Sequence, residues 1–364
     1  MIQLGDICTK ASSGIAQKDL ENCDGVYPIY GASGLIKYVD FYQQENPYVA
    51  VVKDGAGVGR VLQLPAKSSV IGTMQYIIPN EGISVHYLAY AMEHMNLAKY
   101  YTGATIPHIY FKDYCKENLQ SHTLNEQCHI ALVLDKIVSL ISLRKQQLAK
   151  LDELVKARFV EMFGDPMRNP LEWPIHQLQK HILFLTSGSR GWAQYFTNSG
   201  EYFITIKNVK NCRVTLDDVQ YVIPPNDAEA KRTKVEEGDL LISITADLGR
   251  TGVITKEIAD YGAYINQHLT CIRLDRKALH PLYVAYYMES EAGKTQFRLK
   301  NQNGVKAGLN FNAINSLNLM VPPLERQNYF VDFVAKMERQ KLTIQQSLDK
   351  LEVLRKSLMQ EYFG

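Results

Sequence analysis

The stretch LNEQCHIALVLDKIVSLISLRKQQLAKLDELVKARFVEMFG at residues 124–164 returns in altered form as LERQNYFVDFVAKMERQKLTIQQSLDKLEVLRKSLMQEYFG at residues 324–364. The two copies align without a gap, 200 positions apart, and both end in Phe-Gly. A duplication with so long a period does not indicate a solenoid, whose repeats are a few tens of residues long. It indicates that the chain consists of two copies of one unit, each a globular block followed by a long segment.

Apolar residues recur every seven positions in both copies, which is typical of a helix that faces a partner helix. Arg144 and Arg158 interrupt the apolar seam in the first copy, and Lys341 and Arg355 interrupt it in the second. Because the interruptions fall at different heptad positions, we expect each helix to be the partner of the other. Two ordinary helices, each packed on its own block, are the alternative, which their length disfavours because an average helix has about a dozen residues. The predicted seam residues are Leu134, Ile141, Leu148, Val155, Met337, Ile344, Leu351 and Leu358.

The duplication also predicts the architecture. If an internal two-fold axis relates the copies, the helices run antiparallel and a globular block lies at each end. We therefore predict the α+β class, with two α/β domains separated by an antiparallel coiled coil of two long helices, in an internal pseudo-two-fold repeat. At about 1.5 Å per residue, about 38 helical residues span roughly 57 Å. The predicted segments are a first domain at 1–123, a first long spacer helix at 124–164, a second domain with its leading linker at 165–322 and a second long spacer helix at 323–364.

Short strands with turn signals fill both globular blocks, which indicates a mixed α/β composition. In the first block we expect strands at 26–30, 48–52, 59–64 and 69–78, a helix at 86–95 and a polar loop at 102–108. The second block repeats this order with divergent residues, and we pair residues 247–252 with 54–59 and residues 265–269 with 72–76. The long helices are more alike than the blocks. We therefore expect a shared helical frame with two diverged blocks, which bind two different ligands of one kind.

Composition and targeting signals bound the class of protein. The chain has 364 residues, 46% of them apolar, which is ordinary for a globular protein of two domains. It has no run of about eighteen apolar residues, and its first residues lack the basic start and apolar core of a secretory signal. The six cysteines show no CxxC spacing, which argues against a zinc site or a disulfide framework. We expect a cytoplasmic protein that does not enter a membrane.

Motifs for catalysis are absent from the sequence. There is no GxxxxGK[ST] loop for nucleotide phosphates, and no cluster of His, Cys and carboxylates has metal-ligand spacing. The run GAGVG at residues 55–59 follows a strand, as a dinucleotide loop does, but its spacing is GxGxG and a second strand comes next. A tight hairpin is therefore the better interpretation of those glycines. We predict no catalytic residue, no metal ligand and no enzyme activity for this chain.

Several local motifs occur in a fixed order along the two halves. They are YPIYGASGLIKY (27–38), GDLLISITADLGRTG (238–252), INQHL (265–269), GLNFNAINSL (308–317) and VPPLERQ (321–327). With these motifs and its tandem plan of block, helix, block and helix, the chain resembles the specificity (S) subunit of type I restriction–modification systems over essentially its whole length. One departure is that the first long helix follows Ser121-His122-Thr123 instead of a Pro-Pro pair.

The resemblance implies a non-catalytic reader of double-stranded DNA. Each block would be a target-recognition domain that reads one half of a bipartite, asymmetric site, and the helices would set the distance between the halves. The resemblance further implies two methyltransferase (M) subunits docked on the helices, and motor-nuclease (R) subunits joined through the M subunits. S-adenosylmethionine, ATP and Mg would then be bound by those partners, so no cofactor is expected for this chain. A spacer of roughly 57 Å corresponds to at most about 17 base pairs.

Contacts to DNA are expected from polar side chains on loops and strand ends, because paired donors and acceptors read bases and cations bind phosphates. Some of these side chains are instead expected to hold the loops themselves. Lys53, Gln75, Arg250, Asn266 and Gln267 are favoured, because each lies in or beside a turn that occurs in both halves. The full set of predicted DNA-binding residues is Lys10, Ser13, Tyr30, Ser33, Lys53, Arg60, Thr73, Gln75, Thr105, His108, Ser189, Arg190, Lys207, Asn208, Thr245, Arg250, Asn266, Gln267, His268, Lys306 and Asn310.

Two other classes of function remain open. A coiled-coil scaffold whose paired modules bind protein partners is favoured by the net charge of only +2, which is no strong nucleic-acid footprint. An enzyme that acts on DNA itself is disfavoured by the missing catalytic motifs. Salt dependence separates the first alternative from a DNA reader, because DNA binding weakens steeply as salt rises.

Overall fold

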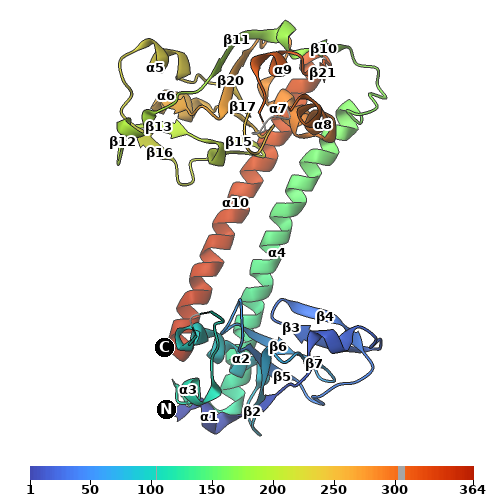
Figure 1. Cartoon of the computed structure of the whole chain (residues 1–364), viewed down its shortest axis with the longest axis vertical. Coiled ribbons are helices and arrows are strands. Elements are labelled where there is room, and N and C mark those ends of the chain that lie inside the picture. Colours follow the sequence, from blue (N-terminus) through green and yellow to red (C-terminus); the bar gives the residue numbers. More distant parts are fainter. Residues whose placement is uncertain (104, 302–307) are drawn as a thin grey trace. The chain divides into compact units, whose positions relative to one another are not determined.

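The computed structural model describes residues 1–103, 105–301 and 308–364. The chain forms two compact units, which we call unit 1 (Met1–Gln147 with Ile344–Gly364) and unit 2 (Leu148–Thr343) (Figure 1). The two long helices, α4 (Leu124–Phe163) and α10 (Leu324–Phe363), each contribute one part to unit 1 and one part to unit 2.

Unit 1 is built on two small sheets. The first is antiparallel, and its strand order is β2 (Cys8–Ser12), β8 (Met74–Pro79), β5 (Tyr48–Val52) and β6 (Val61–Leu64). The second consists of β4 (Gly34–Val39), β3 (Tyr27–Gly31) and β7 (Ser69–Val70), with β3 and β7 parallel. A further pair joins β1 (Ile2–Gln3) to β9 (Asn118–Leu119). The run YVAVV of β5 is buried at every position, as expected for a central strand covered on both faces.

Helices close the core of unit 1. They are α1 (Leu4–Ile7), η1 (Gln17–Leu20), α2 (Val85–His94), η2 (Leu97–Tyr100) and α3 (Phe111–Tyr114). The buried face of α2 packs in one apolar cluster with Ile130 and Leu134 of α4 and with Met359 and Phe363 of α10. The end of the second long helix is therefore part of the core that the first block forms.

Unit 2 is larger but has the same plan. Its main sheet has the order β11 (Ile182–Ser187), β20 (Leu269–Leu274), β17 (Leu240–Ser243), β18 (Thr251–Val253), β15 (Cys212–Val214) and β14 (Val209–Lys210). Its second sheet has the order β12 (Phe196–Thr197), β16 (Gln220–Val222), β13 (Glu201–Ile204) and β19 (Ala263–Ile265), and β10 (Ile175–Gln177) pairs with β21 (Asn318–Met320). The helices are η3 (Leu178–His181), η4 (Trp192–Tyr195), η5 (Ile206–Asn208), α5 (Ala228–Thr233), α6 (Lys256–Tyr261), α7 (Pro281–Glu289), α8 (Glu291–Lys300) and α9 (Phe311–Asn315).

The strand orders of the two units match. The order β2-β8-β5-β6 returns as β11-β20-β17-β18, and the parallel pair of β3 and β7 returns as the parallel pair of β13 and β19. One expectation about the first block is wrong: residues 69–78 are not one strand, because β7 and β8 belong to different sheets. The chain crosses between the sheets at Gly72, whose amide donates to the carbonyl of Ile15 at 2.8 Å.

Each long helix has 40 residues. α10 begins 200 positions after α4 begins, and it ends 200 positions after α4 ends. In unit 1, Ile130 and Leu134 pack near Met359, and Lys145 Nζ lies 3.1 Å from Glu352 Oε1. In unit 2, the rings of Phe159 and Phe330 lie 5.3 Å apart, and Asp152 pairs with Lys341. Residues early in one helix thus contact residues late in the other, so the two helix segments run in opposite directions within each unit.

None of the eight predicted seam residues is exposed. Leu134, Val155 and Met337 are buried, and the other five predicted seam residues are half-buried. Lys341 interrupts the seam but is only 9% exposed, and its amino group pairs with Asp152 and, at 3.3 Å, with Glu338. Pairing of this kind is what a buried charge requires.

No helix within residues 1–103, 105–301 and 308–364 combines the length and the apolar character that a membrane span requires.

Candidate nucleic-acid interface

Five chain segments of unit 1 meet where β5 ends, and we call them loop cluster 1: residues 13–16, 30–34, 53–60, 71–74, and 102–103 with 105–109. Backbone hydrogen bonds join them. The amide of Lys53 donates to Thr73 O and the amide of Ile109 donates to Lys53 O, both at 3.0 Å. The guanidinium of Arg60 donates to Ala32 O at 2.7 Å and so ties in the turn between β3 and β4. Loops held by a rigid sheet are a common place for binding residues.

Loop cluster 1 carries cationic and aromatic side chains. His108 Nδ1 pairs with Asp54, whose other oxygen lies 3.8 Å from Lys53 Nζ. The ring of Tyr110 lies 4.2 Å from that of His108, and Tyr110 is exposed. Burial raises the pKa of the Tyr30 hydroxyl, so this group stays protonated and remains a hydrogen-bond donor near neutral pH.

Unit 2 builds the same arrangement, which we call loop cluster 2: residues 187–190, 204–208, 244–250, 265–269 and 308–310. The amide of Ile244 donates to His268 O at 3.0 Å, and the amide of Leu309 donates to Ile244 O at 2.9 Å. The amide of Gln267 donates to Ser189 O at 3.0 Å. Ile244 therefore takes the place that Lys53 has in unit 1, and a bridge between Thr245 and Gly308 takes the place of that between Asp54 and His108.

The hydrogen bonds also correct the predicted pairing of the two blocks. The amides of Gly59 and Gly249 donate to the last residue of β5 and of β17, at 2.8 and 2.9 Å. Arg60 and Arg250 follow these glycines and are equivalent, whereas the prediction paired residues 247–252 with 54–59. Likewise, residues 265–269 correspond to 70–74 and not to 72–76. Loop lengths differ between the units, and α6 is inserted in unit 2, so sequence matching alone does not find the register.

A glycine is required before each of these arginines. Gly59 and Gly249 have φ angles of +84° and +81°, which side chains with a Cβ rarely adopt. A Cβ at Gly59 would meet the backbone of Ala98, and a Cβ at Gly249 would meet the ring of Phe297. The two glycines thus fix the direction in which Arg60 and Arg250 leave the sheet.

The predicted DNA-binding residues of unit 1 divide by exposure. Lys10, Ser33, Arg60, Thr73 and Thr105 are exposed, and Tyr30, Lys53 and His108 are half-buried. All of these except Lys10, which lies along β2, belong to loop cluster 1.

Two predicted residues of unit 1 are buried. Gln75 is 6% exposed, and its side-chain oxygen accepts a hydrogen bond from the Tyr114 hydroxyl at 2.8 Å. The Ser13 hydroxyl accepts one from the amide of Ile15 at 3.2 Å. Ser13 thus supports its own loop, Gln75 joins β8 to α3, and both side chains offer little surface to DNA.

The predicted residues of unit 2 divide in the same way. Arg190, Lys207 and Asn310 are exposed, and Thr245, Arg250, Asn266, Gln267 and His268 are half-buried. Ser189 and Asn208 are buried. Lys306 lies outside the described residues.

Hydrogen bonds show which of these groups support the loops. The carbonyl of the Asn208 side chain accepts from the amide of Thr205 at 3.0 Å, and the Asn310 side chain caps α9 through Ala313 N at 2.8 Å. Thr245 Oγ1 and His268 Nδ1 lie 2.6 Å apart, and Arg250 Nε donates to Asp247 at 2.6 Å. Gln267 is half-buried, and its side-chain nitrogen lies 3.3 Å from His268 Nε2.

Sequence reasoning missed two side chains that border the loop clusters. Arg232 of α5 donates from Nη1 to Ser187 O at 2.6 Å, beside Ser189 in loop cluster 2. Nothing in the sequence signals this residue, because α5 belongs to a segment without a counterpart in the first block. Tyr110 lies two residues after the predicted loop at 102–108, and an aromatic residue next to a polar loop was the available signal.

Both clusters present polar and cationic side chains. They present arginine, lysine, histidine and amide groups, which bind phosphates and base edges. Among the residues that the structure describes, no group of three or more His, Cys, Asp or Glu side chains has a metal-binding arrangement.

The chain thus has two α+β units whose loop clusters share the same backbone hydrogen bonds. The model of the type I restriction modification DNA specificity domain matches residues 1–153 and 192–353. The match covers most of the chain, which therefore belongs to this family. The resemblance drawn from the sequence is confirmed.

Individual relatives agree with this assignment. The EcoBI specificity subunit of a type I restriction enzyme from Escherichia coli is 21% identical over 138 residues, which are 38% of this chain and 28% of that protein. The alignment thus spans less than a third of that relative.

Two solved structures share the fold. The S subunit of a type I restriction–modification system from M. genitalium matches with a TM-score of 0.61 and 14% identity, over 100% of this chain and 95% of that chain. A chain from a structure on complex assembly and conformational transition of the type I R-M system matches with a TM-score of 0.59 and 15% identity, over 99% and 96%.

Proposed function

We propose that this chain is the sequence-specific DNA-recognition subunit of a type I restriction–modification complex. The observation that carries the proposal is that both units of a specificity-domain chain build the same loop cluster at the end of the central strand, but with different side chains. Equivalent frames with unlike surfaces are what a reader of two unlike half-sites needs.

Each target-recognition domain reads one half of a bipartite, asymmetric site. The first domain is residues 1–123 and the second is residues 165–322. Exposed cations of the loop clusters contact phosphates and position the domain on the duplex, and amide and guanidinium groups read base edges in the groove. Arg60 and Arg250 make equivalent contacts in the two halves, whereas the different neighbours of these arginines make the half-sites differ.

The long helices at 124–164 and 323–364 form an antiparallel coiled coil that separates the domains and sets the spacing of the half-sites. The equal lengths of the two helices and their opposite directions within each unit support this arrangement. The matching strand orders of the two units support an internal pseudo-two-fold repeat.

The chain is a non-catalytic subunit and binds no cofactor of its own. Two methyltransferase subunits dock on it, and motor-nuclease subunits join through them. S-adenosylmethionine, ATP and Mg are bound by these partners. The absence of a nucleotide phosphate loop from the sequence supports this division of labour.

The test is a selection from random duplexes by the purified chain together with its methyltransferase partner. We expect enrichment of one split sequence with two unlike half-sites at a fixed distance. Enrichment of a single continuous sequence, or of no sequence, contradicts the proposed function. Binding that does not weaken as salt rises favours the alternative of a scaffold for protein partners.

A further inference from the structure

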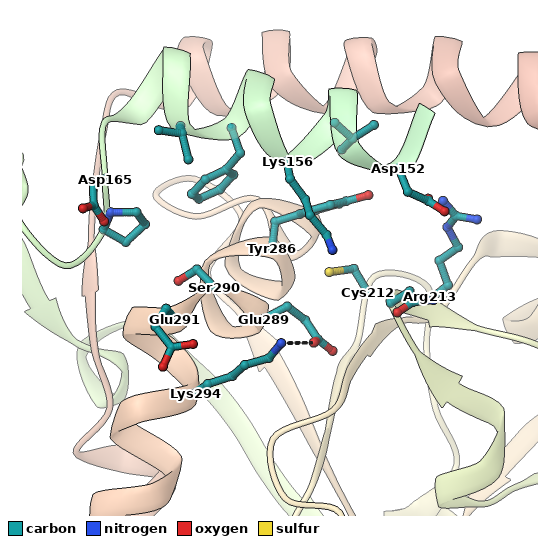
Figure 2. A pocket seen from close by; sticks show the side chains of 15 residues that line it. Asp152, Lys156, Asp165, Cys212, Arg213, Tyr286, Glu289, Ser290, Glu291 and Lys294 are labelled. Carbon is teal, nitrogen blue, oxygen red and sulfur yellow. Dashed lines mark ion pairs between the residues drawn. The ribbon is translucent and has the colours of Figure 1, made fainter. Parts of the chain in front are cut away.

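A cleft of about 480 Å³ lies inside unit 2, between the last turns of α4, the loop before β15 and the junction of α7 and α8 (Figure 2). Val155, Phe159 and Tyr286 give it apolar walls. Its volume is that of a site for a few side chains or a small ligand. Loop cluster 2 contributes none of the residues that line it, so the cleft is separate from the candidate DNA interface.

The carboxylates around this cleft already have partners. Glu289 accepts from the amide of Thr251 at 2.9 Å and lies 4.0 Å from Lys294 Nζ, and Asp152 pairs with Lys341. The remaining pairs of lining charges are Asp165 with Arg168 at 3.6 Å, Glu291 with Arg298, and Arg213 with Glu338.

One cation that lines the cleft, Lys156, lacks such a carboxylate partner among the described residues. Lys156 projects from α4 into the cleft in Figure 2, and it forms no ion pair with any carboxylate in the described part of the chain. The cleft therefore offers one uncompensated positive charge beside an apolar wall.

Unit 1 has a cleft of about 350 Å³ at the equivalent place. It is lined by Arg355, Lys356, Met359 and Gln360 of α10 and by the end of α2. These α10 positions are 200 residues after positions 155, 156, 159 and 160, which line the cleft of unit 2.

In the smaller cleft, too, the carboxylate is paired and one lysine has no ion pair in the described part of the chain. The carboxylate of Glu93 accepts two hydrogen bonds from Arg355 Nη2, at 2.7 and 2.8 Å. Lys356 has no carboxylate partner among residues 1–103, 105–301 and 308–364. Arg355 stands where unit 2 has Val155.

We propose that the two clefts are docking sites for one kind of segment of a partner protein, a segment with a carboxylate beside an apolar side chain, with one copy in each cleft. The apolar side chain enters the wall of the cleft, and the carboxylate pairs with Lys156 in one cleft and with Lys356 in the other. A charge-assisted hydrogen bond at the edge of a desolvated pocket gives both orientation and affinity. The proposal rests on the proposed function, because a complex with two copies of one partner needs two equivalent docking sites.

The test measures how many methyltransferase subunits bind the full chain. Sedimentation equilibrium is run with the wild type, Lys156→Glu, Lys356→Glu and the double variant. Lys350→Glu is the matched control, because Lys350 is an exposed lysine of α10 that lines neither cleft. We expect two bound copies for the wild type and the control, one tight copy for each single variant with at least a tenfold weaker second site, and none for the double variant. Two copies with unchanged affinity in both single variants overturn the proposal.

Carbodiimide cross-linking identifies the occupant. The reagent joins a lysine amine to a carboxylate as an amide with loss of water, so mass spectrometry of the complex should find Lys156 and Lys356 joined to the same acidic segment of the methyltransferase. Cross-links of these lysines only to a second copy of this chain, or no cross-links at all, overturn the proposal.

The selection from random duplexes distinguishes a failure of the docking proposal from a failure of the proposed DNA-recognition function. If the wild type enriches a split sequence while the lysine variants keep both partner copies, the docking proposal fails and the proposed function stands. If the wild type enriches no split sequence, the proposed function fails.

Discussion

Gln127, buried at the start of α4, accepts a hydrogen bond from the backbone amide of Ser84 at 3.0 Å. Gln327 makes the same contact with the amide of His280 at 2.8 Å. In each glutamine the side-chain amide donates to a carbonyl five residues earlier, that of His122 or Pro322. Ser84 and His280 cap α2 and α7, so each glutamine ties the beginning of a long helix to the cap of the helix beneath it.

Replacing Gln327 by Ala should destabilise unit 2. The change removes the partner of the buried Pro322 carbonyl and of the half-buried His280 amide and Ala278 carbonyl, at up to about 1–3 kcal/mol for each unsatisfied group. Scanning calorimetry checks the loss. Gln345→Ala on the exposed face of α10 is the control and should change the free energy of unfolding by less than about 0.5 kcal/mol. Equal effects of the two changes would refute the anchoring role.

Leu348→Ala should cost about 2–5 kcal/mol, because this side chain of α10 is buried and its removal leaves a cavity. Leu342→Ala on the same helix removes an equally large side chain that is exposed, and it should have little effect. Urea unfolding of both variants compares them. A Leu348 variant as stable as the Leu342 variant would show that burial of Leu348 contributes nothing to stability.

Unit 2 should lose stability as the pH falls below about 6.5. Burial, reinforced by Arg276, lowers the pKa of His280 from 6.5 although Asp332 opposes the shift, and burial with His176 lowers that of His181. Because the unfolded state then binds these protons more readily than the folded state, this part of the stability is complete above pH 6.5 and is lost below it. His280 Nδ1 must also stay unprotonated to accept from Leu282 N at 3.1 Å.

His280→Asn is the variant that isolates this effect. Asparagine also caps helices but does not titrate. Calorimetry at pH 7.5 and 5.5 should therefore show a smaller loss in the variant than in the wild type. An identical pH dependence would assign the loss to other groups.

Arg60 and Arg250 should each affect one half-site. If each pairs with a base edge, Arg250→Gln relaxes specificity at one position of one half-site by about 1–3 kcal/mol, and Arg60→Gln does so in the other. Selection from random duplexes by the complex measures this. Arg168→Gln in the exposed linker is the control. A uniform loss of affinity with unchanged sequence preference would make the arginines phosphate contacts instead.

The sequence predicted the long helices well because helix periodicity and duplication are local signals. The predicted range 124–164 agrees with α4 to within one residue. The loops were harder to predict, because the register between the units depends on loop lengths and on the inserted α6.

The sequence also did not predict which single polar side chains are buried. Gln75 and Asn208 have the residue types of base readers, but the strand face of Gln75 and the turn around Asn208 direct their amides into the protein. The partner of Gln75, Tyr114, is 39 positions away in the chain, and local sequence patterns do not reveal such a contact. The equivalence of Arg60 and Arg250 likewise became visible only through the backbone hydrogen bonds of Gly59 and Gly249.

The division of labour between the two domains and the helices is tested most directly by inserting seven residues into the middle of both long helices and selecting duplexes again. Seven residues keep the heptad register and lengthen each helix by about 10 Å, which is about three base pairs. We expect unchanged half-site sequences separated by about three more base pairs. Altered half-site sequences, or an unchanged separation, would contradict it.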